Sequence, residues 1–244
     1  MKPLCRFITP ALLLCLTTVG CTPKQTDPAE TEQSSHSEAE SATEQLDPPK
    51  DFGEGYTQLT MTDFQGYSVN ENAWKHYGDR IVTNGATKGY IYTKGSYKNF
   101  ILTLEYRFEP PVDADEKRIQ NCNTGVLLYV QEPHKVWPVS LEVQGKFVEM
   151  GSIKPNGGAA DVVIEDHPEV RESKRKPVGE WNHFEIHSTD GALQAFLNGE
   201  LICKSEAGEL KSGVIGLQSE GDMVEFRYIA IKPLDTDTTP PTAE

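Results

Sequence analysis

The chain has 244 residues, 37 of them acidic and 23 basic, and a formal net charge of −14. This acidity and the lack of a basic patch argue against nucleic acid as a partner. The length is enough for one large all-β domain or two small ones, and the folded pattern between residues 51 and 234 favours one.

The first twenty residues form a targeting segment. Lys2 and Arg6 precede an apolar stretch, Ile8 to Leu16, that is too short to span a bilayer. The run from Thr18 to Cys21 resembles the end of a bacterial lipoprotein signal, in which Cys21 becomes the lipidated first residue. The alternative is an ordinary secretory signal with an incidental cysteine. The segment predicts export and, with Thr22 after the cysteine, a lipid anchor at the outer membrane or periplasmic face of the cell envelope.

Two segments have compositions that cannot form a core. Residues 21–50 contain almost no large apolar side chains, and they predict a disordered acidic tether behind the lipidated N-terminus. Residues 235–244, rich in Thr and Pro, predict a disordered tail. The domain therefore comprises residues 51–234.

Within the domain, short alternating runs are separated by Gly, Asn and Asp, a pattern typical of antiparallel strands. The strands predicted are Arg80–Val82, Tyr90–Thr93, Asn99–Phe108, Gly125–Val130, Val139–Gln144, Phe147–Ile153, Asn182–Ser188, Leu193–Leu197, Glu200–Lys204, Val214–Ser219 and Val224–Lys232. Asp190-Gly191 and Asn198-Gly199 are two-residue hairpin loops, which make residues 182–204 a three-stranded meander.

One short polar helix is predicted to begin at Asp166 as its N-cap and to run to Lys176 before Pro177. Many antiparallel strands with one small surface helix predict an all-β fold, a two-sheet β-sandwich or jelly roll. Of the cysteines left after cleavage, Cys122 and Cys203 form either a disulfide or two buried free thiols.

Residues 123–151 carry the pattern with the most chemical content. A strand ends at Val130, a loop brings His134 and Trp137, and the strand Ser140–Gln144 follows. Alternation places Glu142 and Gln144 on the face opposite Leu141 and Val143. A carboxylate and an amide so spaced can hold sugar hydroxyls, or the carboxylate can act as a base; the alternative is a solvated strand face.

Other candidates are less specific. Trp137 is either a sugar platform or a plug at the sandwich edge, and His134 is a base, a ligand or a surface residue. Glu105 and Arg107 either line a concave ligand surface or face solvent. Gln218 and Glu220, near the end of the domain, are again an amide and a carboxylate two residues apart. Trp74 and Trp181 are expected in the core.

Several stretches resemble one known family, the 3-keto-disaccharide hydrolase domain family, in the form of its planctomycete-type lipoprotein members. They are WPVSLEVQG, PVGEWNHFEIHSTDGALQAFLNGELI, SGVIGLQSEGDMVEFRYIAIKPL, YIYTKGSYKNFILTLEYRF and NTGVLLYV, between Gly55 and about Leu234. The resemblance implies a concanavalin A-like jelly roll with a concave sugar-binding face. It also implies hydrolysis of glycosides that carry a ketone at sugar carbon 3.

The resemblance also suggests roles for the polar positions. Glu142 is the first candidate for the base and His134 the second, and Arg107 or a bound divalent cation would stabilise an enolate. The residues predicted to contact the sugar are Glu105, Asn123, Trp137, Gln144, Gln218 and Glu220. The insertion from Pro110 to Cys122 is longer than in compact family members, so the identity of the glycan is left open. The sequence also leaves open whether a metal binds and how many copies of the chain assemble.

Two other functions fit the same residues. A sandwich of this kind also serves as a non-catalytic carbohydrate-binding or scaffold module of the cell envelope. An ordinary glycosidase would use two of the acidic residues, one protonated and one ionised. The predicted partners are a carbohydrate substrate and, through the lipid anchor, the membrane.

Overall fold

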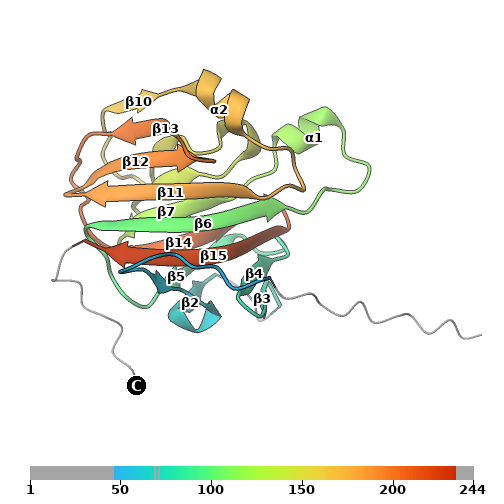
Figure 1. Ribbon diagram of the computed structural model, residues 1–244, viewed down its shortest axis with the longest axis horizontal. Helices are drawn as coiled ribbons and strands as arrows, with labels where there is room; N and C mark the ends of the chain where they lie inside the picture. The colour runs from blue at the N-terminus through green and yellow to red at the C-terminus, as the bar shows by residue number, and fades with distance from the viewer. Residues whose placement is uncertain (1–46, 69, 71, 235–244) are drawn as a thin grey trace, which may run out of the picture. The chain divides into compact units, whose positions relative to one another are not determined.

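The computed structural model describes residues 47–68, 70 and 72–234, which form an all-β jelly-roll sandwich of two antiparallel sheets (Figure 1). This confirms the predicted fold class. The predicted leader, Cys21, the tether up to residue 46 and the tail from 235 lie outside the described residues. No helix in the described part is long and apolar enough to cross a membrane.

The nine-stranded sheet has the order β10-β13-β12-β11-β6-β15-β4-β3, with β1 beside β15. Its strands are β1 (Thr57–Gln58), β3 (Trp74–Tyr77), β4 (Arg80–Thr83), β6 (Phe100–Phe108), β10 (Ile164–Asp166), β11 (Asn182–Thr189), β12 (Ala192–Leu197), β13 (Glu200–Ser205) and β15 (Val224–Pro233). The predicted meander is confirmed, because Asp190, Gly191, Asn198 and Gly199 all have positive φ in the two tight turns.

The six-stranded sheet has the order β2-β5-β14-β7-β8-β9. Its strands are β2 (Phe64–Tyr67), β5 (Gly89–Thr93), β14 (Val214–Ser219), β7 (Gly125–Val130), β8 (Ser140–Gln144) and β9 (Ile153–Asn156). Leu127 on β7 pairs with Glu142 on β8, which in turn pairs with Lys154 on β9. This register fixes which side chains are neighbours on the sheet's faces.

Short helices connect the strands: α1 (Glu116–Gln120), α2 (Pro168–Lys174), and the 3-10 turns η1 (Met61–Asp63) and η2 (Phe147–Glu149). Helix α1 lies inside the predicted insertion. The strand predicted over Phe147–Ile153 is wrong, because η2 and local backbone hydrogen bonds occupy this stretch, including Gly151 N–H to Gln144 O at 2.6 Å. Strand β9 begins only at Ile153.

The predicted helix N-cap is also wrong by one residue. Asp166 ends β10, and its carboxylate pairs with the guanidinium of Arg171, so His167 takes the N-cap position of α2. Arg171 is buried and donates from Nε to the carbonyl oxygen of Met150 at 2.8 Å. This polar helix is therefore fastened to the domain through a buried charge.

The core lies between the sheets and contains alternate side chains from both, such as Leu104 and Phe184 from the nine-stranded sheet and Leu141 and Leu217 from the other. Because strand residues alternate between faces, the residues that alternate with these core positions point to the outer face of each sheet. Cys122 and Cys203 are buried free thiols, so no disulfide joins them.

Three buried hydrogen bonds made by hydroxyl groups of the described residues cross the core between the sheets. The Tyr106 hydroxyl donates to the carbonyl oxygen of Gly145 at 3.1 Å, and the hydroxyls of Tyr129 and Ser188 are 2.6 Å apart. The hydroxyl of Thr83 donates to that of Ser219 at 2.8 Å. These bonds fix the lateral position of one sheet over the other.

We expect Tyr106→Phe to lower the free energy of unfolding by about 1 kcal/mol, because it leaves the buried carbonyl of Gly145 without its donor. Urea unfolding of the variant and of the wild type measures the difference. Equal stability of the two proteins would contradict this inter-sheet bond.

Candidate functional site

The outer face of the six-stranded sheet carries the polar side chains of the central stretch. Leu141 and Val143 point into the core, so Glu142 and Gln144 point outward from β8. The same alternation places Gln218 on the outer face of β14, where Leu217 points inward. We call Asn123, Glu142, Gln144, Asn156, Gln218 and Glu220 the carboxylate–amide cluster.

Glu142 is the most unusual member of this cluster. Its side chain belongs to an outer face, yet the residue is only 7% exposed. It lies over Gly125 of the neighbouring strand, where a Cβ atom would be only 2.2 Å from Glu142 Oε1. Burial, with the nearby charge of Glu220, raises the pKa of Glu142 to about 7, and the ammonium group of Lys154 partly opposes this rise.

Four atoms of the cluster are buried without a hydrogen-bond partner among the described residues. They are Asn123 Oδ1, Glu142 Oε1, Asn156 Nδ2 and Gln218 Oε1. Buried polar atoms normally have partners, since leaving them unpaired costs free energy. Three acceptors and one donor on a single face match the hydroxyl groups of a bound ligand.

Charges around the cluster are mixed. Burial and the carboxylate of Asp222 raise the pKa of Glu220, while Lys88 and Lys146 lower it. The Lys88 ammonium also lies 5.5 Å from the ring of Trp137, which is 44% exposed. The Lys88 ammonium therefore lies near both the exposed indole and the Glu220 carboxyl group.

The loop 131–139 crosses this outer face. At one side of the sheet, the ring of His134 lies 4.2 Å from the ring of Tyr92 and 5.9 Å from that of Tyr67. At the other side, Lys135 Nζ donates to the carbonyl oxygen of Gly157, just after β9, at 2.7 Å. The loop therefore connects the two edges of the sheet over its middle strands.

A second group on the face is aromatic. Tyr67 and Tyr92 pack with His134 around Tyr90, which is fully buried. In register, Tyr90 on β5 is paired with Gln218 on β14. The aromatic cluster of Tyr67, Tyr90, Tyr92 and His134 therefore borders the carboxylate–amide cluster, and the two together present rings and hydrogen-bonding groups suited to a carbohydrate.

Residues 56–232 match the sequence model of the family that the sequence resembles, described as a 3-keto-alpha-glucoside-1,2-lyase-like domain. The match covers well over half of the chain. The chain belongs to this family.

Solved structures support the fold of this lyase-like domain. Two crystal structures from Parabacteroides distasonis ATCC 8503, each described as a "putative glycosyl hydrolase", align with TM-scores of 0.54. One is 20% identical and covers 75% of this chain and 95% of its own. The other is 21% identical, with coverage of 73% and 99%. No curated protein sequence matches the chain significantly.

The structure separates Glu105 and Arg107 from the other predicted site residues. Both lie on β6, on the outer face of the nine-stranded sheet, and the expectation that they converge with Glu142 is wrong. Glu105 accepts from Lys50 at 3.0 Å and from Arg227 at 2.9 Å, and Arg107 pairs with Glu225 at 3.0 Å. Their charges are satisfied within the protein.

Trp181 is not in the core as predicted. It lies on the same outer face as Arg107, with the guanidinium carbons of Arg227, Arg107 and Arg80 at 3.9, 4.7 and 5.7 Å from its ring. Asp47 pairs with Arg80 and Arg227, so the end of the predicted tether docks here. This face is a network of ion pairs around an indole.

Sequence reasoning missed several members of the site. Gly125, Lys154, Asn156, Lys88 and the tyrosines of β2 and β5 carried no motif of their own. The alternation of Tyr90-Ile91-Tyr92 could have indicated two outward tyrosines, but their contact with His134 requires the loop to fold back across three strands. Only the tertiary structure provides that information.

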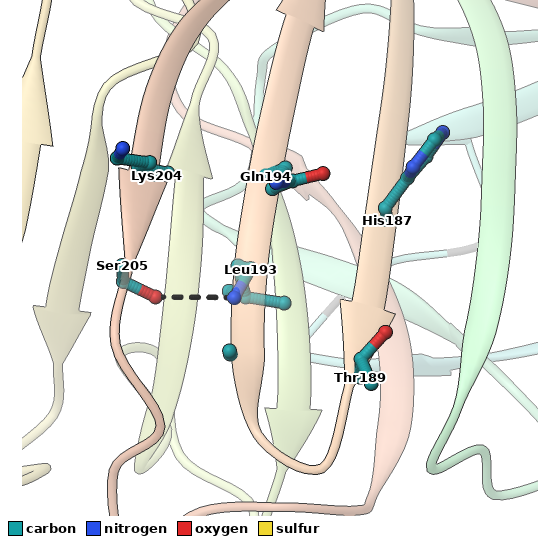
Figure 2. A pocket seen from close by; sticks show the side chains of 7 residues that line it. His187, Thr189, Leu193, Gln194, Lys204 and Ser205 are labelled. Carbon is teal, nitrogen blue, oxygen red and sulfur yellow. Dashed lines mark hydrogen bonds between the residues drawn. The ribbon is translucent and has the colours of Figure 1, made fainter.

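A separate shallow depression lies on the outer face of the nine-stranded sheet, over β11, β12 and β13 (Figure 2). His187, Gln194 and Lys204 form a row across these strands, and Ser205 Oγ accepts from the Leu193 N–H at 3.3 Å. His187 pairs with Glu185. Lys204 pairs with Glu165, so both charged groups of this depression have partners, and we place the site on the six-stranded sheet.

No group of three or more His, Cys, Asp or Glu side chains within the described residues is arranged to hold a metal ion. The carboxylate–amide cluster itself consists of two carboxyl groups and four amides, and lysine ammonium groups act on it from outside. What these residues offer directly is proton transfer and hydrogen bonding, because a carboxyl group with a pKa near 7 exchanges its proton readily at neutral pH.

The raised pKa of Glu142 makes stability depend on pH. Between about pH 4, the ordinary pKa of Glu, and pH 7, the folded protein holds a proton that the unfolded chain releases. The contribution of this bound proton to the free energy of unfolding is fully present below about pH 4 and is lost as the pH rises to about 7. We expect a loss of about 3 kcal/mol in the free energy of unfolding over this range, and Glu142→Gln should lack it.

Urea unfolding at pH 5, 6, 7 and 8 tests this expectation. Glu109→Gln, which changes an exposed carboxylate, is the control and should follow the wild type. A constant difference between wild type and Glu142→Gln at all four pH values would show that Glu142 titrates normally.

The space above Gly125 is a second testable feature. We expect Gly125→Ala to lower the free energy of unfolding by about 2 kcal/mol, because the new methyl group overlaps the Glu142 carboxylate. In a Glu142→Ala background the same change should be nearly neutral. A double-mutant cycle measures the coupling between the two substitutions. Additive changes in the free energy of unfolding would contradict the close approach of the Glu142 carboxylate to Gly125.

Proposed function

We propose that this domain cleaves the glycosidic bond of 3-keto-glycosides, with Glu142 as the base. The observation that carries the proposal is the Glu142 carboxylate, which is buried, unpaired at Oε1 and close to neutral in its pKa. It lies among unpaired amide groups on one sheet face. Membership of a family described by a 1,2-lyase-like activity supports the same chemistry.

The reaction follows from the acidity of a ketone's neighbouring C–H bond. The Glu142 carboxylate removes the proton from C2 of the 3-keto sugar, and the C–H electrons form the C2–C3 enolate. When the enolate collapses, a C1–C2 double bond forms, the C1–O bond breaks, and the leaving oxygen takes the proton that Glu142 removed from C2. The products are an unsaturated 3-keto sugar and a free hydroxyl compound, and addition of water to the former completes a net hydrolysis.

The residues of the outer face take the remaining roles. The Lys154 ammonium, which pairs with Glu149 and also lowers the pKa of Glu142, is the positive group that we place near the developing enolate. Asn123, Gln144 and Gln218 hold sugar hydroxyls, and Trp137 stacks on a ring. Arg107, tied to Glu225 on the other sheet, takes no part.

The cell envelope is the proposed location. The support is the leader sequence and Cys21, which fit an exported protein with a lipid anchor. A lipid-anchored domain would meet oxidised glycosides at the surface or in the periplasm, so the proposed partners are a carbohydrate and the membrane lipid.

The test is to incubate the purified protein with a 3-keto-disaccharide, with and without a chelator, and to follow the released monosaccharide. We expect kcat/KM to rise with pH through about 7, because the base must be ionised. Glu142→Gln should lower kcat by about 10²- to 10⁴-fold. Glu225→Gln is the matched control, because this carboxylate is equally buried but lies on the other sheet.

Other outcomes point to the alternative functions. Binding of the sugar without turnover would indicate a carbohydrate-binding module that uses the same aromatic and amide groups. Cleavage of the unoxidised disaccharide would indicate an ordinary glycosidase that uses Glu142 with Glu220. Equal activity losses in Glu142→Gln and Glu225→Gln would remove Glu142 from the mechanism.

A further inference from the structure

The loop 131–139 is attached to the sheet by a hydrogen bond between two titratable side chains. The hydroxyl oxygen of Tyr90 and Nδ1 of His134 are 2.8 Å apart. Tyr90 is fully buried and His134 half-buried. Because either atom could donate, the direction of this bond determines which imidazole nitrogen carries the proton.

The surroundings of Tyr90 fix that direction. Among the described residues, the Tyr90 hydroxyl has no hydrogen-bond acceptor other than Nδ1 of His134. If Nδ1–H of His134 donated to the Tyr90 oxygen, the buried hydroxyl proton would have no acceptor, which is unfavourable. The consistent arrangement has the Tyr90 O–H donating to Nδ1 of His134.

Two further features support this arrangement. Burial and the neighbouring Tyr92 and Tyr67 raise the pKa of Tyr90 well above its ordinary value, so the phenol keeps its proton. The rings of Tyr92 and Tyr67 also lie against the imidazole and limit its rotation. The imidazole is therefore held in both orientation and hydrogen-bonding pattern.

We propose that Tyr90 is a positioning residue that fixes His134 as the tautomer with its proton on Nε2. Nε2 points away from the Tyr90 hydroxyl, and it has no hydrogen-bond partner among the described residues. In this tautomer Nδ1 accepts the hydrogen bond from Tyr90 and Nε2 carries the proton, so neither nitrogen has a free lone pair. His134 is then a hydrogen-bond donor and not a base, which removes it as the second candidate for that role.

This inference deepens the proposed function and, for its catalytic consequence, rests on it. An Nε2–H donor beside the carboxylate–amide cluster can hydrogen-bond a substrate oxygen on which negative charge develops during elimination. Glu142 would remove a proton at one part of the sugar while His134 donates at another. The tautomer itself is a property of the free protein and needs no substrate.

Nitrogen-15 NMR of the uniformly labelled protein tests the tautomer at about pH 8.5, about two units above the ordinary imidazole pKa. The His134→Gln spectrum assigns the signals by their loss. We expect wild-type His134 to show a protonated Nε2 and an unprotonated, hydrogen-bonded Nδ1. In Tyr90→Phe the two tautomers should exchange and the nitrogen shifts should move toward averaged values.

Tyr92→Phe is the control, because it keeps the ring stacked on His134 and removes a hydroxyl that does not bond it. Its His134 tautomer should equal that of the wild type. A protonated Nδ1 in the wild type would overturn the proposal, as would the same His134 shifts in Tyr90→Phe and wild type. The wild-type spectrum alone decides the point if Tyr90→Phe does not fold.

Activity measurements separate this inference from the proposed function. If the wild type turns over a 3-keto-disaccharide, Tyr90→Phe should lower kcat/KM at least about tenfold while Glu142 still governs the pH profile. A wild type with the Nε2–H tautomer but no turnover would refute the proposed function and leave the tautomer assignment intact. Turnover by a wild type with a protonated Nδ1 would refute the tautomer assignment and leave the proposed function intact.

Discussion

The exclusion of water from one carboxylate is the constraint on which the candidate site depends. Glu142 points from the outer face of a sheet, where a carboxylate normally remains hydrated, but it is 7% exposed and fits over the bare backbone of Gly125. Loss of hydration disfavours the charged form and brings the pKa to about 7. The ammonium group of Lys154 on the next strand lowers the pKa of Glu142, but by less than burial raises it. The result is a carboxyl group that exchanges its proton near neutral pH.

The two outer faces of the sandwich use similar residues for opposite purposes. On the nine-stranded sheet, the carboxylates of Glu105 and Glu225 each meet an arginine, and the arginines surround Trp181. On the six-stranded sheet, the carboxylate and amide oxygens of Glu142 and Gln218 lack partners. Ion pairs of the first kind bind the start of the described chain to the domain. Unpaired groups of the second kind remain available for a ligand.

The loop 131–139 relates the site to the rest of the sheet. It brings His134 to the tyrosines of β2 and β5 and places Lys135 on the backbone after β9. Through these contacts a connection between β7 and β8 reaches strands that are distant in sequence. The aromatic cluster and the carboxylate–amide cluster share one face because Tyr90 and Gln218 are paired on neighbouring strands, and the loop adds His134 to the first of them.

The sequence by itself determined the local features. The alternation in β6 and β8, the two Asx-Gly hairpins and the outward direction of Glu142 and Gln144 all follow from the period of a strand and the φ requirements of tight turns. It also indicated the family. The sequence did not determine which sheet each strand joins, because pairing between distant strands is set by packing across the whole chain. Alternation shows that Glu105 points away from its own apolar neighbours, but only the tertiary structure shows that it lies on the opposite side of the sandwich from Glu142.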